Sequence, residues 1–392
     1  MCDRYAVARR SFDWCAPDRL GRSHGCLRLG VVLVLLAGLL SGCSSWPLGS
    51  EQRGLLPAER EEALGLDLLW PLPLGLGQPV KDIYLLPETL CVVGKDNTFV
   101  TIDPEKGYPL WEQFFDDNVY VRATEDEKNL YLIMGNRLLV VEKGMDKGGI
   151  LKDIRLGFVA TSAATVDAMY AYIGAGDRRL YAVEIGPRLG WQQTVGAAVT
   201  AQPQVDAAGA YFGAEDGVVY GVNLADGTRK WEFATDGPIV ADLSIGRNVL
   251  YVGSTDGKLY ALDTALGASR RQQQRWPLPY FAGGDIRQAP VRRGAAIYVV
   301  AEQTGVHAVQ ADDGTGLWQC PQADAFLAAG KDRVFLGVKG RRLICVDRDT
   351  GAVLWEESLP GGGGYRFVPN AYSDLIYICR ERDGMLYCYQ PR

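Results

Sequence analysis

Hydrophobic and polar residues alternate over short runs along most of the chain, and these runs recur in a repeating unit. The clearest unit, residues 250–267, reads LYVGSTDGKLYALDTALG. Two alternating runs around Asp256-Gly257 predict an antiparallel hairpin with a tight turn. Asp263 and Gly267 then predict a second turn, because an Asp side chain accepts backbone N–H groups and Gly adopts a positive φ.

Eight copies of this unit follow one another, at residues 90–111, 130–144, 169–191, 210–231, 250–267, 297–318, 334–355 and 376–390. The spacing is about 41 residues, which is the length of one four-stranded propeller blade. Because one blade cannot bury both of its faces, the units must pack side by side into a ring. We therefore predict an all-β fold, an eight-bladed β-propeller over residues 66–392.

Tryptophans mark the repeat. A Trp commonly follows the turn glycine by four residues, where it is predicted to begin the outer strand and pack on the next blade. The series is Trp70, Trp111, Trp191, Trp231, Trp276, Trp318 and Trp355. The last unit has no outer strand of its own, and Trp70 lies one period before Trp111. The N-terminal strand around Trp70 is therefore predicted to complete the last blade and close the ring.

The N-terminal segment has the pattern of a secretory signal. Residues 29–40 are an uncharged apolar run, too short to span a membrane as a helix, and arginines precede it. The run ends in Leu40-Ser41-Gly42-Cys43, which resembles the lipobox of bacterial lipoproteins; a chance cysteine is the alternative. We predict a lipoprotein signal peptide over 1–42, an acylated Cys43 bearing palmitate-type chains as membrane anchor, and a lipidated tether over 43–65.

Charge narrows the class of partner. The chain has a formal net charge of −6, and removal of residues 1–42, which hold six Arg and three Asp, makes it −9. An acidic protein is poorly suited to binding the phosphate backbone of nucleic acid. We therefore expect no nucleic-acid partner.

The residue types of an enzyme active site are scarce. His307 is the only histidine after residue 42, and in the aligned repeats it occupies a column that also holds Tyr181, Tyr220 and Tyr260. This favours a structural role and excludes a site built on two histidines. The Asp-rich stretches 347–351 and 311–314 lack the terminal Glu of an EF-hand loop, so we interpret them as turns. We expect no catalytic or metal-binding set.

The cysteines give no pairing from sequence alone. After the signal peptide they stand at Cys43, Cys91, Cys320, Cys345, Cys379 and Cys388, with no vicinal pair and no C-x-x-C spacing. A disulfide stays possible in an exported protein.

Two stretches depart from the repeat length, and loops of a propeller are its usual binding surfaces. Residues 266–274 form a lengthened hairpin, and residues 277–290 form a long connection between blades that contains Tyr280 and Phe281. Loop aromatics can anchor a partner protein. The alternative is that both rings pack on their own blade.

Residues 343–355, LICVDRDTGAVLW, match the A-x-D-x-x-T-G-x-x-x-W pattern of PQQ-type repeats, with Cys345 in the place of Ala. The chain resembles the PQQ-like repeat propellers and, with its lipobox and size, the BamB family of lipoprotein scaffolds. This resemblance implies a non-catalytic scaffold without cofactor, lipid-anchored and facing the periplasm from the outer membrane. It also implies partners among other envelope proteins, including a BamA-like barrel-assembly protein.

Two alternatives follow from the same fold. One is a quinoprotein dehydrogenase-like oxidoreductase that uses PQQ and Ca²⁺; the absence of a vicinal cysteine pair and of long insertions disfavours it. The other is a propeller that binds another envelope partner or a glycan.

Overall fold

The computed structural model describes residues 54–76, 78–119, 121–144, 149–185, 189–264, 274–361 and 363–392. The predicted signal peptide, the lipobox and Cys43 lie outside these residues. No helix in the described part of the chain is long and apolar enough to cross a membrane.

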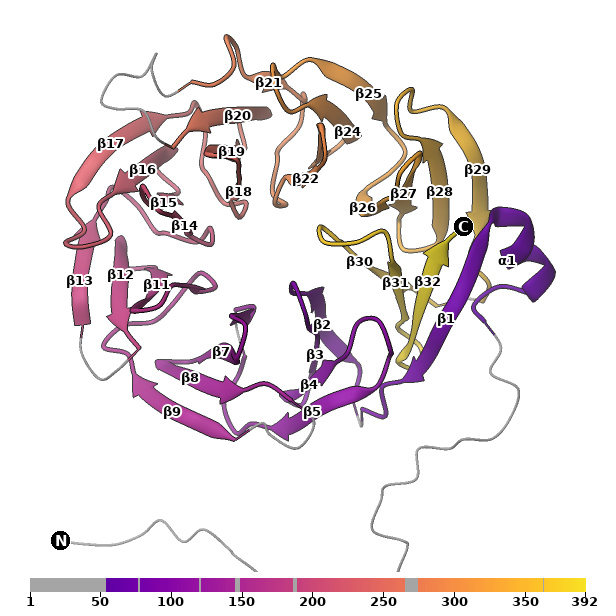
Figure 1. The fold of residues 1–392 in the computed structure, drawn as a ribbon, viewed down its shortest axis with the longest axis horizontal. Coiled ribbons are helices and arrows are strands. Elements are labelled where there is room, and N and C mark those ends of the chain that lie inside the picture. Colours follow the sequence, from indigo (N-terminus) through magenta and orange to yellow (C-terminus); the bar gives the residue numbers. More distant parts are fainter. Residues whose placement is uncertain are drawn as a thin grey trace, which may run out of the picture. The chain divides into compact units, whose positions relative to one another are not determined.

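Residues 66–392 build eight four-stranded antiparallel sheets that follow one another around a ring (Figure 1). In each of the first seven sheets the strands run in chain order from the axis outward. Their bounds are β2 (Val80–Leu85), β3 (Leu90–Gly94), β4 (Thr98–Ile102) and β5 (Pro109–Phe114); β6 (Thr124–Glu125), β7 (Asn129–Met134), β8 (Arg137–Glu142) and β9 (Ile150–Arg155); β10 (Thr165–Val166), β11 (Tyr170–Ala175), β12 (Arg179–Glu184) and β13 (Leu189–Thr194); β14 (Gln204–Asp206), β15 (Gly209–Gly213), β16 (Val218–Val222) and β17 (Arg229–Ala234); β18 (Ser244–Gly246), β19 (Val249–Gly253), β20 (Lys258–Asp263) and β21 (Tyr280–Phe281); β22 (Val291–Arg293), β23 (Ala296–Ala301), β24 (Gly305–Gln310) and β25 (Gly316–Cys320); β26 (Ala325–Ala329), β27 (Arg333–Val338), β28 (Arg342–Asp347) and β29 (Val353–Ser358). The predicted eight-bladed propeller is confirmed.

The eighth blade joins the two ends of the ring. Its inner strands are β30 (Tyr365–Val368), β31 (Ile376–Arg380) and β32 (Met385–Pro391), and its outer strand is β1 (Leu66–Pro73). β1 runs antiparallel to β32, with Leu66 opposite Pro391 and Trp70 opposite Cys388. The prediction that the strand around Trp70 completes the last blade is confirmed. The pairing also covers an edge of β32 that would otherwise expose unpaired backbone groups.

The hydrophobic core lies between the blades. Buried side chains form clusters that each join two successive blades, and the cluster holding Trp70 and Val92 joins the eighth blade to the first. A blade alone would leave both of these faces in water, so burial of the core depends on the closed ring.

The tryptophans fix one blade to the next by a repeated contact. The Nε1–H group of Trp70 donates to the Glu105 carbonyl at 3.0 Å, in the turn between β4 and β5 of the first blade. The indole covers Gly107, where an added Cβ would lie 2.2 Å from the ring. The turn glycine therefore supplies both a positive φ and the space for the indole. The same pair of contacts recurs for Trp191 with Leu224 and Gly227, Trp276 with Ala311 and Gly314, and Trp318 with Arg348 and Gly351.

The stretch 43–65 differs from the predicted tether where the structure describes it. Residues 58–64 form the helix α1 (Ala58–Leu64), which lies beside β1 and β29 (Figure 1). Leu55, Leu56 and Leu64 are buried against the eighth blade. The segment from residue 54 onward is therefore packed on the ring, because its leucines cover an apolar surface there.

Candidate binding site on the ring axis

A cavity lies on the axis of the ring. It consists of two connected hollows of about 370 and 400 Å³, which share Arg122, Asp242 and Tyr372 in their walls. The wall residues come from the inner strands and connections of the first, second, fourth, fifth, sixth, seventh and eighth blades. Only the axis of a ring lies next to so many blades. Ligand sites of proteins are usually concave spaces of this size range.

One inner-strand position of the repeat supplies five residues of this wall, namely Arg122, Gln202, Asp242, Ala289 and Phe326. Tyr131, Tyr211 and Tyr251 lie on the second strands of their blades and pair with Thr124, Gln204 and Ser244 of the inner strands. The position in question lies two residues before each of these inner-strand partners. Around the ring it holds Asp82, Arg122, Ala163, Gln202, Asp242, Ala289, Phe326 and Arg366. We call this set the axial column. Four of its eight members are charged.

Four of the column's polar residues form two pairs, and Arg366 pairs with Glu381. The Nε atom of Arg122 lies 3.4 Å from the Asp82 carboxylate, and its guanidinium also lies over the Tyr84 ring at 5.3 Å. The Asp242 carboxylate accepts the backbone N–H of Gln202 at 2.7 Å. Burial raises the pKa of the Asp242 carboxyl, although the Gln202 N–H and the nearby Arg122 partly offset it.

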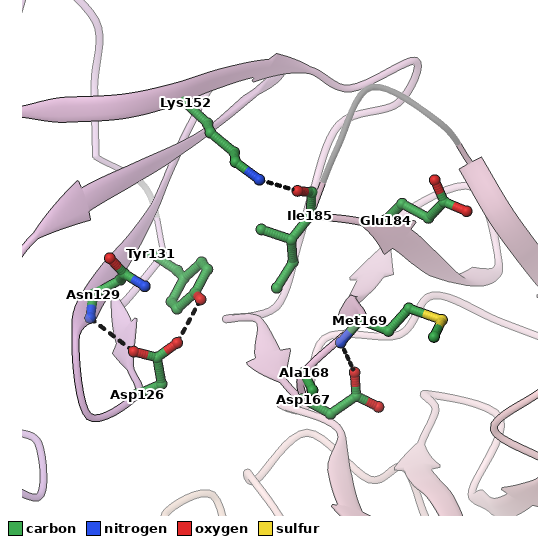
Figure 2. Close-up of a pocket in the computed structure, with 9 residues that line it drawn as sticks. All are labelled: Asp126, Asn129, Tyr131, Lys152, Asp167, Ala168, Met169, Glu184 and Ile185. Carbon is green, nitrogen blue, oxygen red and sulfur yellow. Dashed lines mark hydrogen bonds between the residues drawn. The ribbon is translucent and has the colours of Figure 1, made fainter.

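A separate hollow of about 410 Å³, away from the axial cavity, opens between the second and third blades (Figure 2). Asp126 lines it and accepts the backbone N–H of Asn129 at 2.7 Å and the Tyr131 hydroxyl at 2.6 Å. Burial and the Asp126 carboxylate raise the pKa of Tyr131 to about 12. In the third blade the Asp167 carboxylate likewise accepts the Tyr172 hydroxyl. These carboxylates stabilise turns of the repeat, so this groove offers little free chemistry.

Tyr280 and Phe281 do not lie in a connection between blades, as their position in 277–290 suggested. They form β21, the outer strand of the fifth blade, with Tyr280 opposite Leu259 and Phe281 opposite Lys258. Two additional residues are looped out after Trp276, because Pro277 and Pro279 cannot donate to the sheet. Phe281 is 69% exposed, whereas Tyr280 is half-buried against the sixth blade. Of the predicted pair, only Phe281 is placed to meet a partner.

His307 is buried within the sixth blade, as its repeat column predicted. Its Nδ1 atom lies 3.0 Å from the Tyr280 hydroxyl and its Nε2 atom lies 3.0 Å from the Thr304 hydroxyl. Burial lowers the pKa of His307. Both ring nitrogens are occupied inside the packing between two blades, which is the arrangement of a structural histidine.

The cysteines that the structure describes are all buried free thiols: Cys91, Cys320, Cys345, Cys379 and Cys388. The Asp347 stretch forms a turn, in which its Oδ1 atom accepts the N–H and hydroxyl of Thr350 at 2.8 and 2.7 Å. Within the described residues, no group of three or more His, Cys, Asp or Glu side chains is placed to hold a metal ion.

The fold and its repeats define the class: this is an eight-bladed propeller of PQQ-like repeats. A protein-family model described as outer membrane protein assembly factor BamB matches residues 151–319 and 302–389. These matches cover more than half of the chain, and the chain therefore belongs to the BamB family.

Solved structures share the fold at low sequence identity. BamB from Moraxella catarrhalis matches with a TM-score of 0.66 and 13% identity, over 83% of this chain and 97% of that one. The computationally designed protein Ika8 matches with a TM-score of 0.64 and 16% identity, over 82% and 99%. The quinohemoprotein alcohol dehydrogenase ADHIIG from Pseudomonas putida HK5 matches with a TM-score of 0.59 and 12% identity, over 84% and 76%. A search of curated protein sequences returned no match.

Proposed function

We propose that this protein is a non-catalytic scaffold of the bacterial cell envelope that assists the assembly of outer-membrane β-barrel proteins. Membership of the BamB family carries the proposal. The site chemistry supports it: the His307 imidazole is buried and bonded to Tyr280 and Thr304 inside the packing of two blades, and the described cysteines are buried free thiols. A rigid ring presents loops to partner proteins without doing chemistry itself.

We further propose that acylated Cys43 holds the scaffold at the outer membrane, facing the periplasm. The lipobox sequence before Cys43 supports this, and Ser44 after it is compatible with outer-membrane sorting. Replacement of Cys43 by Ser should move the protein from the membrane fraction to the soluble fraction. If the Cys43→Ser variant stays in the membrane fraction, lipid anchoring through this residue is wrong.

Crosslinking in native membranes tests the partner class. The protein is crosslinked in intact cells, purified under denaturing conditions, and the attached proteins are identified by mass spectrometry. We expect a BamA-like component of the barrel-assembly machinery among them. Recovery of other envelope proteins alone would instead support a propeller with a different partner or a glycan ligand.

The second candidate is a quinoprotein-type oxidoreductase, favoured by the fold match to the quinohemoprotein dehydrogenase. The axial cavity does not fit PQQ with Ca²⁺ well. Among the described residues that line it, Asp242 is the only carboxylate and none is a cysteine. Calcium needs six to eight oxygen ligands, several of them carboxylates. Incubation with PQQ and Ca²⁺ followed by a dye-linked alcohol or sugar oxidation assay tests this candidate, and turnover would overturn the scaffold proposal.

A further inference from the structure

The axial cavity combines cationic and apolar walls. Three arginines, Arg122, Arg287 and Arg292, line it against the single carboxylate of Asp242. Two of these arginines also pair with carboxylates next to the wall: Arg122 with Asp82 at 3.4 Å, and Arg287 with Asp285 at 2.7 Å and Glu302 at 3.2 Å. Arg292 has no ion-pair partner among the described residues, so a bound anion would neutralise a charge that is otherwise unpaired in the cavity.

Two of the arginines, Arg122 and Arg292, have N–H groups that can donate further hydrogen bonds. Arg122 pairs with Asp82 through one nitrogen only, and its side chain is 54% exposed. The Nε atom of Arg292 is buried and has no hydrogen-bond partner among the described residues. An Arg side chain has five N–H donors in a planar fork that matches a carboxylate. A buried donor without a partner is costly, and a bound anion would satisfy it.

The rest of the wall is mixed. Val240, Val291, Val300 and Phe326 line the first hollow, Tyr372 lines both hollows and is 49% exposed, and the polar side chains are Gln202, Gln204, Ser244 and Gln288. The apolar and aromatic side chains favour an apolar or aromatic group over a small hydrophilic ion such as phosphate. The apolar side chains of the wall therefore favour an anion that also has an apolar group.

We propose that the axial cavity is a binding site for a small organic carboxylate with an aromatic or aliphatic group. The carboxylate pairs with Arg122 and Arg292, and the apolar group lies along Phe326 and Tyr372. The proposal does not depend on the assembly role.

The test uses the full chain in detergent and three probes that separate the two parts of the ligand. These are 3-phenylpropionate, its neutral amide, and propionate, each titrated by ligand-observed NMR. We expect saturable binding of 3-phenylpropionate with a Kd of about 1 mM or tighter. The amide, which lacks the charge, and propionate, which lacks the ring, should each bind about tenfold more weakly.

Variants locate the site. Arg122→Gln should weaken 3-phenylpropionate binding about tenfold, whereas Arg137→Gln, a matched change on the outer face of the second blade, should leave it within about twofold. Asp242→Asn should tighten binding, because it removes the only carboxylate from the wall. Tyr372→Ala, at a half-exposed residue whose loss the fold should tolerate, should weaken binding and serves as the second probe if Arg122→Gln fails to fold.

Three results would overturn the proposal: no saturable binding of 3-phenylpropionate, equal binding of its amide, or equal affinities of the Arg122→Gln and Arg137→Gln variants. Weaker binding by Asp242→Asn would contradict the assigned position of the carboxylate. None of these results bears on the crosslinking test, so the two proposals fail separately.

Discussion

At the scale of single residues, a few positions of the repeat have the same structural role in successive blades. A turn glycine combines a positive φ with space for an indole, as Gly351 does beneath Trp318. An Asp holds the same turn by accepting its N–H groups, as Asp347 does. The sequence predicts these duties because they need particular residue types at fixed spacing. It does not reveal which column faces the axis, since Arg122 and Asp242 share a position but no residue type.

The two duties of the turn glycine can be separated. Gly351→Ala places a Cβ about 2.5 Å from Trp318 at a φ of +70°, whereas Gly361 has a φ of +90° with nothing within 4 Å of an added Cβ. Gly361→Ala should cost about 1 kcal/mol from backbone strain, and Gly351→Ala about 2–4 kcal/mol from strain and the indole clash. Denaturant unfolding compares them; equal costs would show that the indole contact matters little.

His307 predicts a pH dependence of stability. Burial lowers its pKa in the folded protein, so the folded state resists protonation while the unfolded chain accepts a proton below about pH 6.5. The contribution of His307 to stability is therefore fully present above pH 6.5 and is lost as the pH falls toward the lowered pKa. The melting temperature of wild type should fall more between pH 7 and pH 5 than that of His307→Gln. Parallel curves for the two proteins would contradict a neutral, buried His307.

At the scale of elements, hairpins with strict alternation are predicted well and irregular elements are not. The second and third strands of each blade follow from period-two patterning and Asp-Gly turns. The inner strands are short, such as β6 with two residues, and several pair irregularly. The sequence does not predict β21, because the two prolines that precede it are not typical of a strand. Helix α1 has seven residues, too few for a clear helical period, and its stability comes from contacts that the sequence alone does not show.

Helix α1 and the residues before it make specific contacts with the last blade. The Tyr389 hydroxyl donates to the Glu61 carboxylate at 2.7 Å and accepts the Leu55 N–H at 2.7 Å. Arg60 pairs with Glu357 of β29. In the other blades a turn joins the third strand to the outer strand. In the eighth blade these two strands, β32 and β1, are not joined by a turn, and the segment with α1 packs at that place.

Substitution within α1 tests this role. Glu61 is buried and Glu62 is exposed on the same helix. Glu61→Ala should destabilise the protein by about 1–3 kcal/mol, because Tyr389 loses a charged acceptor, and Glu62→Ala should change stability by less than about 0.5 kcal/mol. The midpoint of denaturant unfolding measures both. A Glu61→Ala variant as stable as Glu62→Ala would mean that the helix adds nothing to the ring.

At the scale of the whole molecule, closure makes the stability of every blade depend on one contact between the chain ends. Trp70 belongs to the cluster that joins the last blade to the first, and its indole donates to Glu105. The period of the tryptophans was sufficient to predict this closure, because a ring of identical units leaves one strand unpaired at its end. The partner of the ring could not be predicted in this way, since fold does not specify function.

Opening the closure should weaken the whole ring. Trp70→Ala removes a buried indole and should destabilise the protein by about 3–5 kcal/mol. Leu69→Ala, on the same strand at a residue that is 42% exposed, is the control and should cost less than about 1 kcal/mol. Calorimetry and tryptophan fluorescence give the melting temperatures. Similar values for the two variants would argue against closure through Trp70.

The central claim is the proposal that this propeller is anchored by lipid and assists the assembly of outer-membrane β-barrel proteins. The most direct measurement is the amount of folded β-barrel protein, quantified by heat-modifiable gel mobility in outer membranes from cells with and without the protein. We predict lower amounts in its absence, with recovery when the full chain is restored and no recovery with the Trp70→Ala variant. Unchanged amounts of folded β-barrel proteins in cells that lack the protein would contradict the claim.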